Sequence, residues 1–596
     1  MVSMHEDYPL ILEDVTFTYE GSRKPALKDV DLKIRRGEIT AVLGRTGAGK
    51  TTLIYAMGGV IPNYVKGELK GRVLVEGLDT RDYPLYELAM HVGVVMDDPE
   101  AHIVSFTVWE DAAFGPSNLG LPKDEILKRV DFALDATRLG ALRYRNPYNL
   151  SGGEKQSLAI AGVLSMMPNV IALDEPTSML DPLGSMRVLS VLKELNRRYG
   201  ITVVLSSFDA EEIIGLADRI VVLDGGEVVI DGGCREVMQE VDMLERIGIR
   251  IPDVSKLSMM LKMEGVWREG LAMDIDEAFK HIADMLRDKR TPPFRIDSVA
   301  KEDIGTSLTK PVEPIIRIRR LSHIYPSGVR ALRDVNLDIY SGEFVALIGQ
   351  NGSGKTTLAK YLCGLLKPRD KSIEVIVDGL DLRKASMKEI VRKIGYVFQI
   401  PEQQLFFATV REEIGFGLRN MGLPEEYVER RVEEIIRILG LEAYGDSITS
   451  SLDRGKKFRV VLGSVIAMDP KIIVVDEPTT GQDWIDSIYV CRLLDDLRRR
   501  DGKTVIMITH EMELVARFAD RVIVMHEGGI ILDGTPRYVF SKPEILRVTW
   551  VQPPQITRLS QMLSEYGIPG DILSVEDMHR CITHILGGGV DGSTRV

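Results

Sequence analysis

The sequence predicts an α/β protein with two copies of one phosphate-binding domain, each built on a largely parallel sheet. Three observations lead to this prediction. A glycine-rich loop of one spacing follows an apolar strand in each half of the chain. Short apolar strands alternate with helical segments after each loop, which is typical of a parallel sheet covered on both faces. Paired landmarks also recur 302 residues apart, such as Asp174 with Asp476 and Pro252 with Pro554.

The two glycine-rich loops share the spacing G-x-x-x-x-G-K-T and follow the apolar runs 39–43 and 344–348. Such a loop turns backbone N–H groups towards phosphate oxygens, and the next helix adds its partial positive charge. The lysine can reach the terminal phosphates, and the first threonine, Thr51 or Thr356, can bind Mg²⁺. We therefore expect nucleotide contacts from two sets of residues: Gly44, Arg45, Thr46, Gly47, Ala48, Gly49, Lys50, Thr51 and Thr52, and Gly349, Gln350, Asn351, Gly352, Ser353, Gly354, Lys355, Thr356 and Thr357.

Length, charge and cysteine content narrow the class of protein. A chain of 596 residues exceeds what a single core supports, so several domains are expected. The net charge of −13 disfavours nucleic acid as a partner of the whole molecule. The four cysteines are scattered, without a C-x-x-C pair, as in a reducing cytosol. No apolar stretch approaches the roughly 20 residues of a membrane span, so we expect a cytosolic protein, or one at the cytosolic face of a membrane.

The repeat also predicts the domain boundaries. Each half has two β-rich stretches, the phosphate loop, a helical segment, alternating strands and helices, and a β-hairpin. The tail 252–258 resembles the tail 554–560, so a small α-rich domain is expected after each core. The proline-containing stretch between the halves reads as a linker. The predicted parts are 1–232 and 315–534 for the two cores, 233–289 and 535–596 for the small domains, and 290–314 for the linker.

An apolar strand ends in Asp-Glu-Pro in each half, behind the phosphate loop. The first carboxylate, Asp174 or Asp476, suits Mg²⁺ binding. The second, Glu175 or Glu477, can polarise an attacking water. An Asp-Glu pair after a strand is most often a solvated turn, but its place behind a phosphate loop favours the catalytic interpretation.

The sequence from Leu150 to Gln156, L-S-G-G-E-K-Q, resembles the signature of ATP-binding-cassette (ABC) ATPases, and the resemblance covers both halves. It implies two P-loop NTPase cassettes, each with a RecA-like, mostly parallel sheet, an N-terminal antiparallel β subdomain and a helical signature subdomain, and it implies ATP and Mg²⁺ as cofactors. Further roles implied by the resemblance are phosphate binding by Ser151, Gly152 and Gly153, adenine stacking by Tyr19 and Tyr325, and catalysis or metal binding by Gln399 and His510.

The resemblance also implies that two cassettes close head to tail, each ATP lying between one phosphate loop and the other half's signature. The second phosphate loop with Glu477, His510 and the intact first signature then forms a complete site. The other site combines every departure from the family pattern: Asp97 and Phe208 in the first half, and the altered signature 452–458 in the second. We therefore expect one hydrolytic site and one that mainly holds nucleotide, where Glu175 leaves slow turnover open.

The segments 399–406 and 416–424 resemble those of ATPases from energy-coupling factor (ECF) importers, which carry vitamins or transition-metal ions. That resemblance implies peripheral attachment to the cytoplasmic face of the cell membrane, with a transmembrane T-component and a substrate-binding S-component as partners. Nucleic acid is not expected as a partner, because the chain is acidic and has no basic runs. The linker is long enough for an intramolecular cassette dimer, and the sequence leaves pairing with a second chain open. The alternative is a soluble twin-cassette ATPase acting on ribosomes or in DNA repair; a third reading is a non-hydrolysing scaffold. The sequence does not select the transported substrate.

Overall fold

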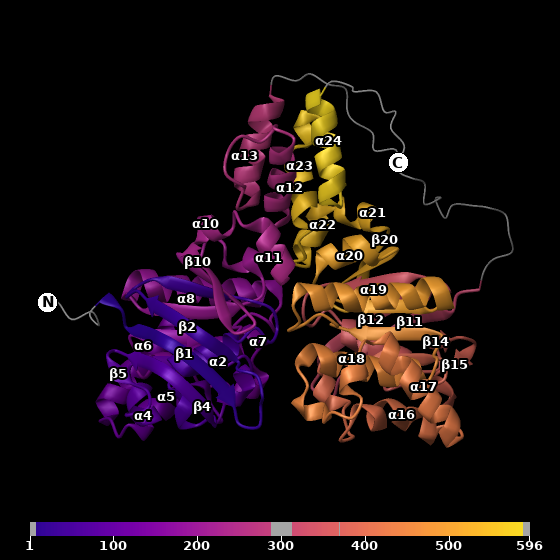
Figure 1. The fold of residues 1–596 in the computed structure, drawn as a ribbon. Helices are drawn as coiled ribbons and strands as arrows, with labels where there is room; N and C mark the ends of the chain where they lie inside the picture. Colours follow the sequence, from indigo (N-terminus) through magenta and orange to yellow (C-terminus); the bar gives the residue numbers. More distant parts are fainter. Residues whose placement is uncertain (1–6, 288–312, 369, 588–596) are drawn as a thin grey trace. The chain divides into compact units, whose positions relative to one another are not determined.

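The computed structural model describes residues 7–287, 313–368 and 370–587 (Figure 1). The chain divides into two compact units, Met1–Pro252 and Asp253–Val596. The predicted linker, 290–314, lies outside the described residues except for its last two. No helix within the described residues is both long and apolar enough to cross a bilayer.

The first unit contains two sheets. The antiparallel sheet has the order β2-β1-β4-β5, and the central sheet has the order β10-β9-β3-β8-β7-β6. Neighbours in the central sheet are parallel except for the hairpin β9–β10. The strands are β1 (Leu10–Tyr19), β2 (Leu27–Ile34), β3 (Ile39–Leu43), β4 (Gly67–Val75), β5 (Leu78–Asp79), β6 (Val92–Val95), β7 (Val170–Leu173), β8 (Thr202–Ser207), β9 (Arg219–Asp224) and β10 (Glu227–Gly233).

Local sequence explains where the helices of this unit begin and end. Thr107 caps α5 by accepting a hydrogen bond from the Glu110 N–H, and Asp181 caps α8 in the same way through Gly184. Gly200 ends α8 in the left-handed region, at φ 70°. The α-helices are α2 (Lys50–Met57), α3 (Val60–Asn63), α4 (Leu85–Leu88), α5 (Val108–Asn118), α6 (Lys123–Ala136), α7 (Gly152–Leu164), α8 (Pro182–Tyr199), α9 (Ala210–Ile213), α10 (Cys234–Val237) and α11 (Val241–Ile247).

The second unit repeats the two sheets, with the orders β12-β11-β14-β15 and β16-β17-β18-β13-β19-β20. The predicted fold class, two α/β cassettes each with a mostly parallel sheet and an antiparallel subdomain, is confirmed. The short edge strands β5 and β15, two residues each, were missed by the sequence analysis. The strands are β11 (Ile316–Ile324), β12 (Arg330–Ile339), β13 (Phe344–Ile348), β14 (Glu374–Val377), β15 (Leu380–Asp381), β16 (Ile394–Val397), β17 (Ile472–Asp476), β18 (Thr504–Ile508), β19 (Arg521–His526) and β20 (Gly529–Gly534).

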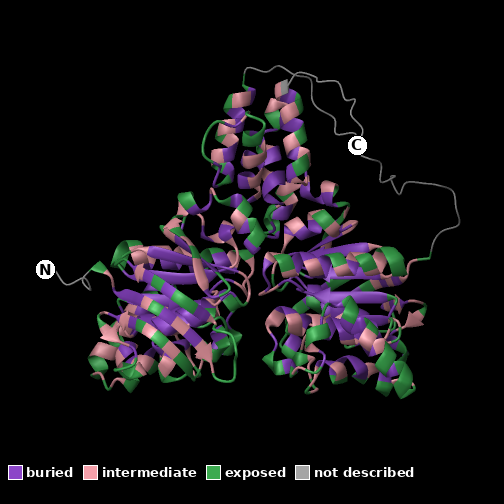
Figure 2. Cartoon of the chain, viewed as in Figure 1, coloured by how far each residue is buried: buried purple, intermediate pink, exposed green. Residues whose placement is uncertain are grey.

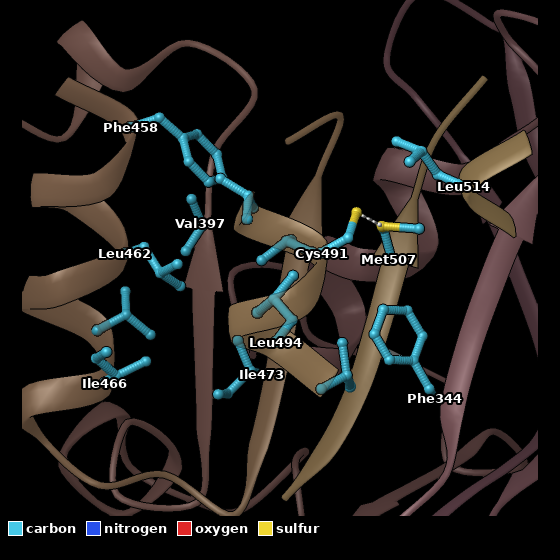
Figure 3. Packing of buried hydrophobic residues seen from close by; sticks show 14 of the residues in the cluster. Phe344, Val397, Phe458, Leu462, Ile466, Ile473, Cys491, Leu494, Met507 and Leu514 are labelled. Carbon is cyan, nitrogen blue, oxygen red and sulfur yellow. Dashed lines mark hydrogen bonds between the residues drawn. The ribbon is translucent and has the colours of Figure 1, made fainter. Parts of the chain in front are cut away.

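The central sheet of this unit is covered by helices through an apolar cluster (Figure 3). Leu462 on α18 and Leu494 on α19 pack against residues of β13, β16, β17 and β18. The Sγ atom of Cys491 lies 3.9 Å from the Sδ atom of Met507, and burial raises the pKa of this thiol to about 12. The cysteine is therefore a protonated packing residue. Figure 2 shows the same layering, with buried strands and exposed outer helix faces.

The helices of the second unit include two that precede its cassette in sequence. They are α12 (Asp253–Met263), α13 (Ile275–Leu286), α14 (Lys355–Leu362), α15 (Met387–Ile390), α16 (Val410–Asn420), α17 (Glu425–Ile438), α18 (Arg454–Ala467), α19 (Trp484–Asp501), α20 (Met512–Phe518), α21 (Pro536–Phe540), α22 (Pro543–Val548), α23 (Gln555–Met562) and α24 (Val575–Gly587).

Four of these helices form a separate apolar cluster: α12 packs against α24, and α13 against α23 (Figure 1). The Val254 N–H donates a hydrogen bond of 2.9 Å to Gln555 Oε1 at the start of α23. The stretch 233–289 is therefore divided between the units, with α10 and α11 in the first and α12 and α13 in the second. Segments that are 302 residues apart in sequence thus become neighbours.

Candidate functional site

The first phosphate loop joins β3 to α2, and its shape requires glycine. Gly49 has a φ of 105°, and a Cβ at this position would lie 2.6 Å from the carbonyl oxygen of Ala26. The Lys50 ammonium points into the loop, where it donates to the carbonyl oxygens of Gly44 at 2.8 Å and Arg45 at 3.1 Å. The ammonium therefore lies among the backbone groups that would surround a phosphate.

The second phosphate loop has the same geometry between β13 and α14. Lys355 Nζ donates to the carbonyl oxygens of Gly349 at 2.6 Å and Gln350 at 3.2 Å. The Ser353 Oγ atom is buried and has no hydrogen-bond partner among the described residues. Leaving a buried hydroxyl unpaired is unfavourable, and a phosphate oxygen would supply its partner. The loop therefore fits a nucleotide phosphate.

The two predicted adenine-stacking tyrosines are tied to the phosphate loops. Tyr19, the last residue of β1, has its hydroxyl 2.9 Å from the Thr52 hydroxyl, and Tyr325 has its hydroxyl 3.1 Å from that of Thr357. Both rings are half-buried. Each tyrosine hydroxyl is therefore held at the helix that follows the loop, and its aromatic ring could stack on a base.

In the first half, the acid pair after β7 is held by neighbouring hydroxyl and ammonium groups. Asp174 Oδ1 accepts a hydrogen bond of 2.7 Å from the Ser206 hydroxyl and a further one from Thr51. Glu175 Oε1 lies 3.0 Å from Lys50 Nζ. Burial raises the pKa of both carboxyls, and the nearby Asp97 carboxylate acts in the same direction. The first half thus pairs its candidate catalytic glutamate with its own phosphate-loop lysine.

In the second half, the acid pair after β17 has different partners. Tyr396 donates a hydrogen bond of 2.8 Å to Asp476 Oδ2, and Thr356 also hydrogen-bonds to this carboxylate. Burial raises the pKa of Asp476, and burial together with this carboxylate keeps the Tyr396 hydroxyl protonated by raising its pKa. A threonine hydroxyl beside a carboxylate provides the hard oxygen ligands that Mg²⁺ prefers, so these residues fit the ion.

Glu477 is held by the predicted switch histidine. His510 Nε2 lies 3.0 Å from Glu477 Oε1 and 3.2 Å from Asn351 Oδ1 of the phosphate loop. The counterpart of His510 is Phe208, a half-buried ring that offers no such hydrogen bond. Glu477, His510 and the second phosphate loop therefore form one contact network in this half.

The two candidate catalytic glutamates share an unusual backbone conformation. Glu175 has a φ of 42° and Glu477 a φ of 49°, in the left-handed region that non-glycine residues rarely adopt. The Glu175 N–H donates to Ser206 Oγ at 2.8 Å, and the Glu477 N–H donates to the Ile508 carbonyl at 2.9 Å. These contacts hold the strained turn in the same shape in both halves.

The signature helices begin differently. α7 begins with a capping box, in which the Ser151 Oγ accepts from the Glu154 N–H and Glu154 Oε2 accepts from the Ser151 N–H at 2.8 Å. In α18 the cap is Asp453, which accepts from the Lys456 N–H at 2.8 Å and forms an ion pair with the Lys456 ammonium. The second signature thus places its own carboxylate where the first presents a hydroxyl.

A salt bridge joins each signature helix to the segment that follows β6 or β16. Lys457 Nζ lies 2.9 Å from Glu402 Oε1 in the second half, and Lys155 pairs with Glu100 in the first. The pairs are equivalent under the 302-residue repeat. Each links the segment that precedes α5 or α16 to the helix that carries the signature.

The same segments contain a second matched pair of contacts. The Phe398 N–H donates to Gln404 Oε1 at 2.7 Å, and the Met96 N–H donates to His102 Nε2 at 2.9 Å. His102 therefore takes over the acceptor role of Gln404, which requires a neutral ring. Burial lowers the pKa of His102 and favours that neutral form. Gln399 and its counterpart Asp97 are both exposed.

Each unit therefore brings together its own phosphate loop, aromatic residue and acid pair. The predicted meeting of Ser151–Gly153 with the second phosphate loop involves both units and stays a prediction. The sequence did not predict that Ser206 and Tyr396 donate hydrogen bonds to Asp174 and Asp476, the carboxylates expected to bind Mg²⁺. Neither lies in a motif, and only the register of neighbouring strands places them beside the carboxylates.

Taken together, these groups define two nucleoside-triphosphate-binding cassettes in one chain. The family model described as "ABC transporter" matches residues 27–178 and 332–480. The chain belongs to the ABC transporter family and is an ATPase with two cassettes. Cassettes of this family bind ATP with Mg²⁺ and dimerise.

Relatives resemble the chain over nearly its whole length. A "Putative ABC transporter ATP-binding protein" of Methanosarcina mazei is 39% identical over 576 residues, covering 95% of this chain and 96% of the relative. A protein of the same description from Caldanaerobacter subterraneus subsp. tengcongensis is 36% identical over 588 residues, covering 96% and 99%. The whole two-cassette arrangement is therefore shared with these relatives.

Two solved structures resemble part of the chain. The structure of cbiO1 from Clostridium perfringens, described as part of the ABC transporter complex cbiONQ, is 35% identical, with a TM-score of 0.37, and covers 41% of this chain and 98% of that one. The post-hydrolysis dimer of the ATP-binding cassette MJ0796 with ADP and phosphate is 29% identical, with a TM-score of 0.35, and covers 37% and 98%.

Proposed function

We propose that this chain is the ATP-hydrolysing subunit of an ECF-type importer for a vitamin or a transition-metal ion, with its hydrolytic site at the second phosphate loop. The observation that carries the hydrolytic assignment is the contact of His510 with both Glu477 and Asn351. The first half has Phe208 at the histidine position and pairs Glu175 with Lys50 instead.

The residues of the second half divide the work of hydrolysis. Lys355 would bind the terminal phosphates, and Thr356 and Asp476 would hold the Mg²⁺. Glu477 polarises the attacking water, and His510 fixes the orientation of that carboxylate. A Mg²⁺ ion held there would neutralise charge that develops on the phosphate oxygens. Gln399 lies just after β16, and its side chain would be a further ligand of the metal or a contact for the attacking water.

The first signature completes this site in the proposal. Ser151 and the N–H groups of Gly152 and Gly153 at the start of α7 offer an anion site for the γ-phosphate. At the other composite site, the Asp453 carboxylate and its Lys456 partner occupy the corresponding helix start. A phosphate would have to displace that ion pair. Closure therefore supports turnover at the second phosphate loop and mainly nucleotide holding at the first.

The docking of membrane subunits is supported by exposed apolar side chains in the segments joined to the signature helices. Phe406 is 74% exposed between Glu402 and α16, and Phe416 on α16 is also exposed. In the first half, Phe106 before α5 and Phe114 on α5 are exposed in the corresponding segment. Apolar side chains on the surface of a charged protein favour a protein partner. The Lys457–Glu402 ion pair then connects the docking segment with α18.

The transporter assignment is tested by the partners that remain with the full chain. The tagged chain is purified from detergent-solubilised membranes in moderate salt, as wild type and as Phe406→Asp, and bound proteins are identified. We expect integral membrane proteins with the wild type and their loss with Phe406→Asp. Met263→Asp, which changes an exposed side chain on α12, is the matched control and should keep them.

Copurification of ribosomal particles or DNA-repair proteins in place of membrane proteins would contradict the importer assignment. That result would favour the second candidate, a soluble twin-cassette ATPase, which shares the family and the ATPase chemistry.

A further inference from the structure

We propose that Tyr396 is a positioning residue that orients the Asp476 carboxylate towards the Mg²⁺ of ATP in the second half. The inference rests on the proposed function in one respect, since it assumes that the second half is the hydrolytic one. Tyr396 lies on β16, next to β17, and its hydroxyl donates to Asp476 Oδ2 at 2.8 Å. Asp476 is 2% exposed, so water cannot readily replace this contact.

The hydrogen bond restricts how the carboxylate can turn. Asp476 also hydrogen-bonds to Thr356, so its orientation is set from the phosphate-loop side and from β16. The Tyr396 ring is itself fixed by an edge contact with Phe398, with ring centroids 4.8 Å apart. Hydrogen bonds to an ionised carboxylate are stronger than neutral ones. A fixed carboxylate binds Mg²⁺ without first losing rotational freedom.

The first half meets the same need with a different residue. The counterpart of Tyr396 is Val94, which has no hydroxyl, and Asp174 instead accepts from Ser206 at 2.7 Å. The counterpart of Ser206 in the second half is Ile508, which cannot donate from its side chain. The donor strands lie on opposite sides of the acid-bearing strand: β8 beside β7, and β16 beside β17. Each half keeps one such hydroxyl, which indicates that the carboxylate requires a donor.

The position of Tyr396 on β16 also connects it with the segment that precedes α16. The Gln404 side chain donates a hydrogen bond of 3.0 Å from Nε2 to the Tyr396 carbonyl oxygen, and its Oε1 atom accepts one from the Phe398 N–H. Gln404 lies in the segment that precedes α16 and contains exposed Phe406. In the second half, the orientation of the metal-binding carboxylate thus depends on the strand that leads into this segment. In the first half it depends on β8, which leads to Phe208.

The test is Tyr396→Phe, which removes the hydroxyl and keeps the ring. The Mg²⁺ dependence of ATPase activity is measured, and the Mg²⁺ concentration that gives half-maximal turnover should rise about five- to tenfold. A second readout is thermal stabilisation by a non-hydrolysable ATP analogue, titrated with Mg²⁺ in a Lys50→Ala background so that the second half dominates. The same rightward shift is expected, with unchanged stabilisation by the analogue in EDTA.

A transplanted donor sharpens the test. Ile508→Thr in the Tyr396→Phe background supplies a hydroxyl at the position of Ser206 and should bring the Mg²⁺ dependence back towards the parent value. Tyr489→Phe is the matched control: its hydroxyl donates to the Ile438 carbonyl on the helical side of the unit, so its loss should leave the Mg²⁺ dependence unchanged.

Tyr396→Phe with the parent's Mg²⁺ dependence in both measurements, and the parent's melting temperature without nucleotide, would overturn the proposal. Both measurements use the purified full chain without membrane partners. A failure here is therefore distinct from a failure of the importer assignment, which the copurification experiment decides.

Discussion

The two halves of this protein share a fold and differ in how they hold the same two carboxylates. In the first half Glu175 is paired with Lys50, whereas Glu477 in the second half is paired with His510. The carboxylate predicted to bind Mg²⁺ accepts a hydrogen bond from the Ser206 hydroxyl in the first half and from the Tyr396 hydroxyl in the second. The backbone of a duplicated cassette can therefore stay the same while a few residues that contact the two carboxylates differ between the copies. We propose that these differences give the two copies different functions.

The largest expected effect separates the two glutamates. Glu477→Gln keeps the shape but removes the carboxylate that polarises water, so steady-state ATPase activity should fall by about 100-fold or more. Glu175→Gln should change it less than twofold, because the first phosphate loop mainly holds nucleotide. Phosphate release by the purified variants decides the comparison. Equal losses in the two variants would show that the halves are functionally equivalent.

The signatures offer the next comparison. Ser151→Asp would give the first signature the carboxylate that the second carries, and repulsion of the γ-phosphate should reduce turnover by roughly 30-fold. Asp453→Ser, the reverse exchange, should leave turnover within about twofold, since that signature faces the nucleotide-holding site in the proposal. ATPase assays at saturating ATP test both. A larger loss from Asp453→Ser than from Ser151→Asp would reverse the proposed pairing of signatures and phosphate loops.

Substitution of the residue at the switch-histidine position should have a smaller effect on turnover. His510→Phe removes the hydrogen-bonding ring from Glu477 and Asn351, which should lower kcat about tenfold with little change in KM for ATP. Phe208→His in the first half is the matched variant. It should not raise total turnover, because Asp453 still opposes phosphate there. Doubled activity in Phe208→His would contradict that reasoning.

The smallest effect concerns His102, which replaces the Gln404 acceptor in the first half. Its pKa is lowered by burial, so the unfolded chain takes up the proton at a higher pH than the folded chain does. The stability that neutral His102 contributes is therefore complete above the ordinary histidine pKa of 6.5 and declines as the pH falls below it. His102→Gln should reduce this acid sensitivity, measured as urea midpoints at pH 5.5 and 7.5.

His281→Gln is the control for that experiment, since His281 pairs with Glu269 in the second unit. It should leave the pH dependence of the first unit's transition unchanged. Identical acid sensitivity in wild type and His102→Gln would show that the Met96 contact is not titrated.

Much of the fold and part of the candidate site could be predicted because their signals are local. The apolar runs 39–43 and 344–348 coincide with β3 and β13, and the two glycine-rich loops fall at the β3–α2 and β13–α14 junctions. The left-handed Gly49 and Gly354 follow from loop spacing alone. The Lys50–Glu175 contact could not be predicted, since the same lysine and glutamate types occur in the second half, where the glutamate pairs with a histidine.

The duplication, the phosphate loops, the acid pairs and the departures at Phe208 and Asp453 follow from the sequence without a structure. Each of these features depends on residues that are neighbours in the sequence or on a constant spacing between two residues. Two features come from the tertiary structure instead: the hydrogen bond from the Tyr396 hydroxyl to Asp476, and the packing of α12 and α13 against α23 and α24. Such contacts join residues far apart in the chain, so strand register and helix packing select them, and no local pattern records that choice.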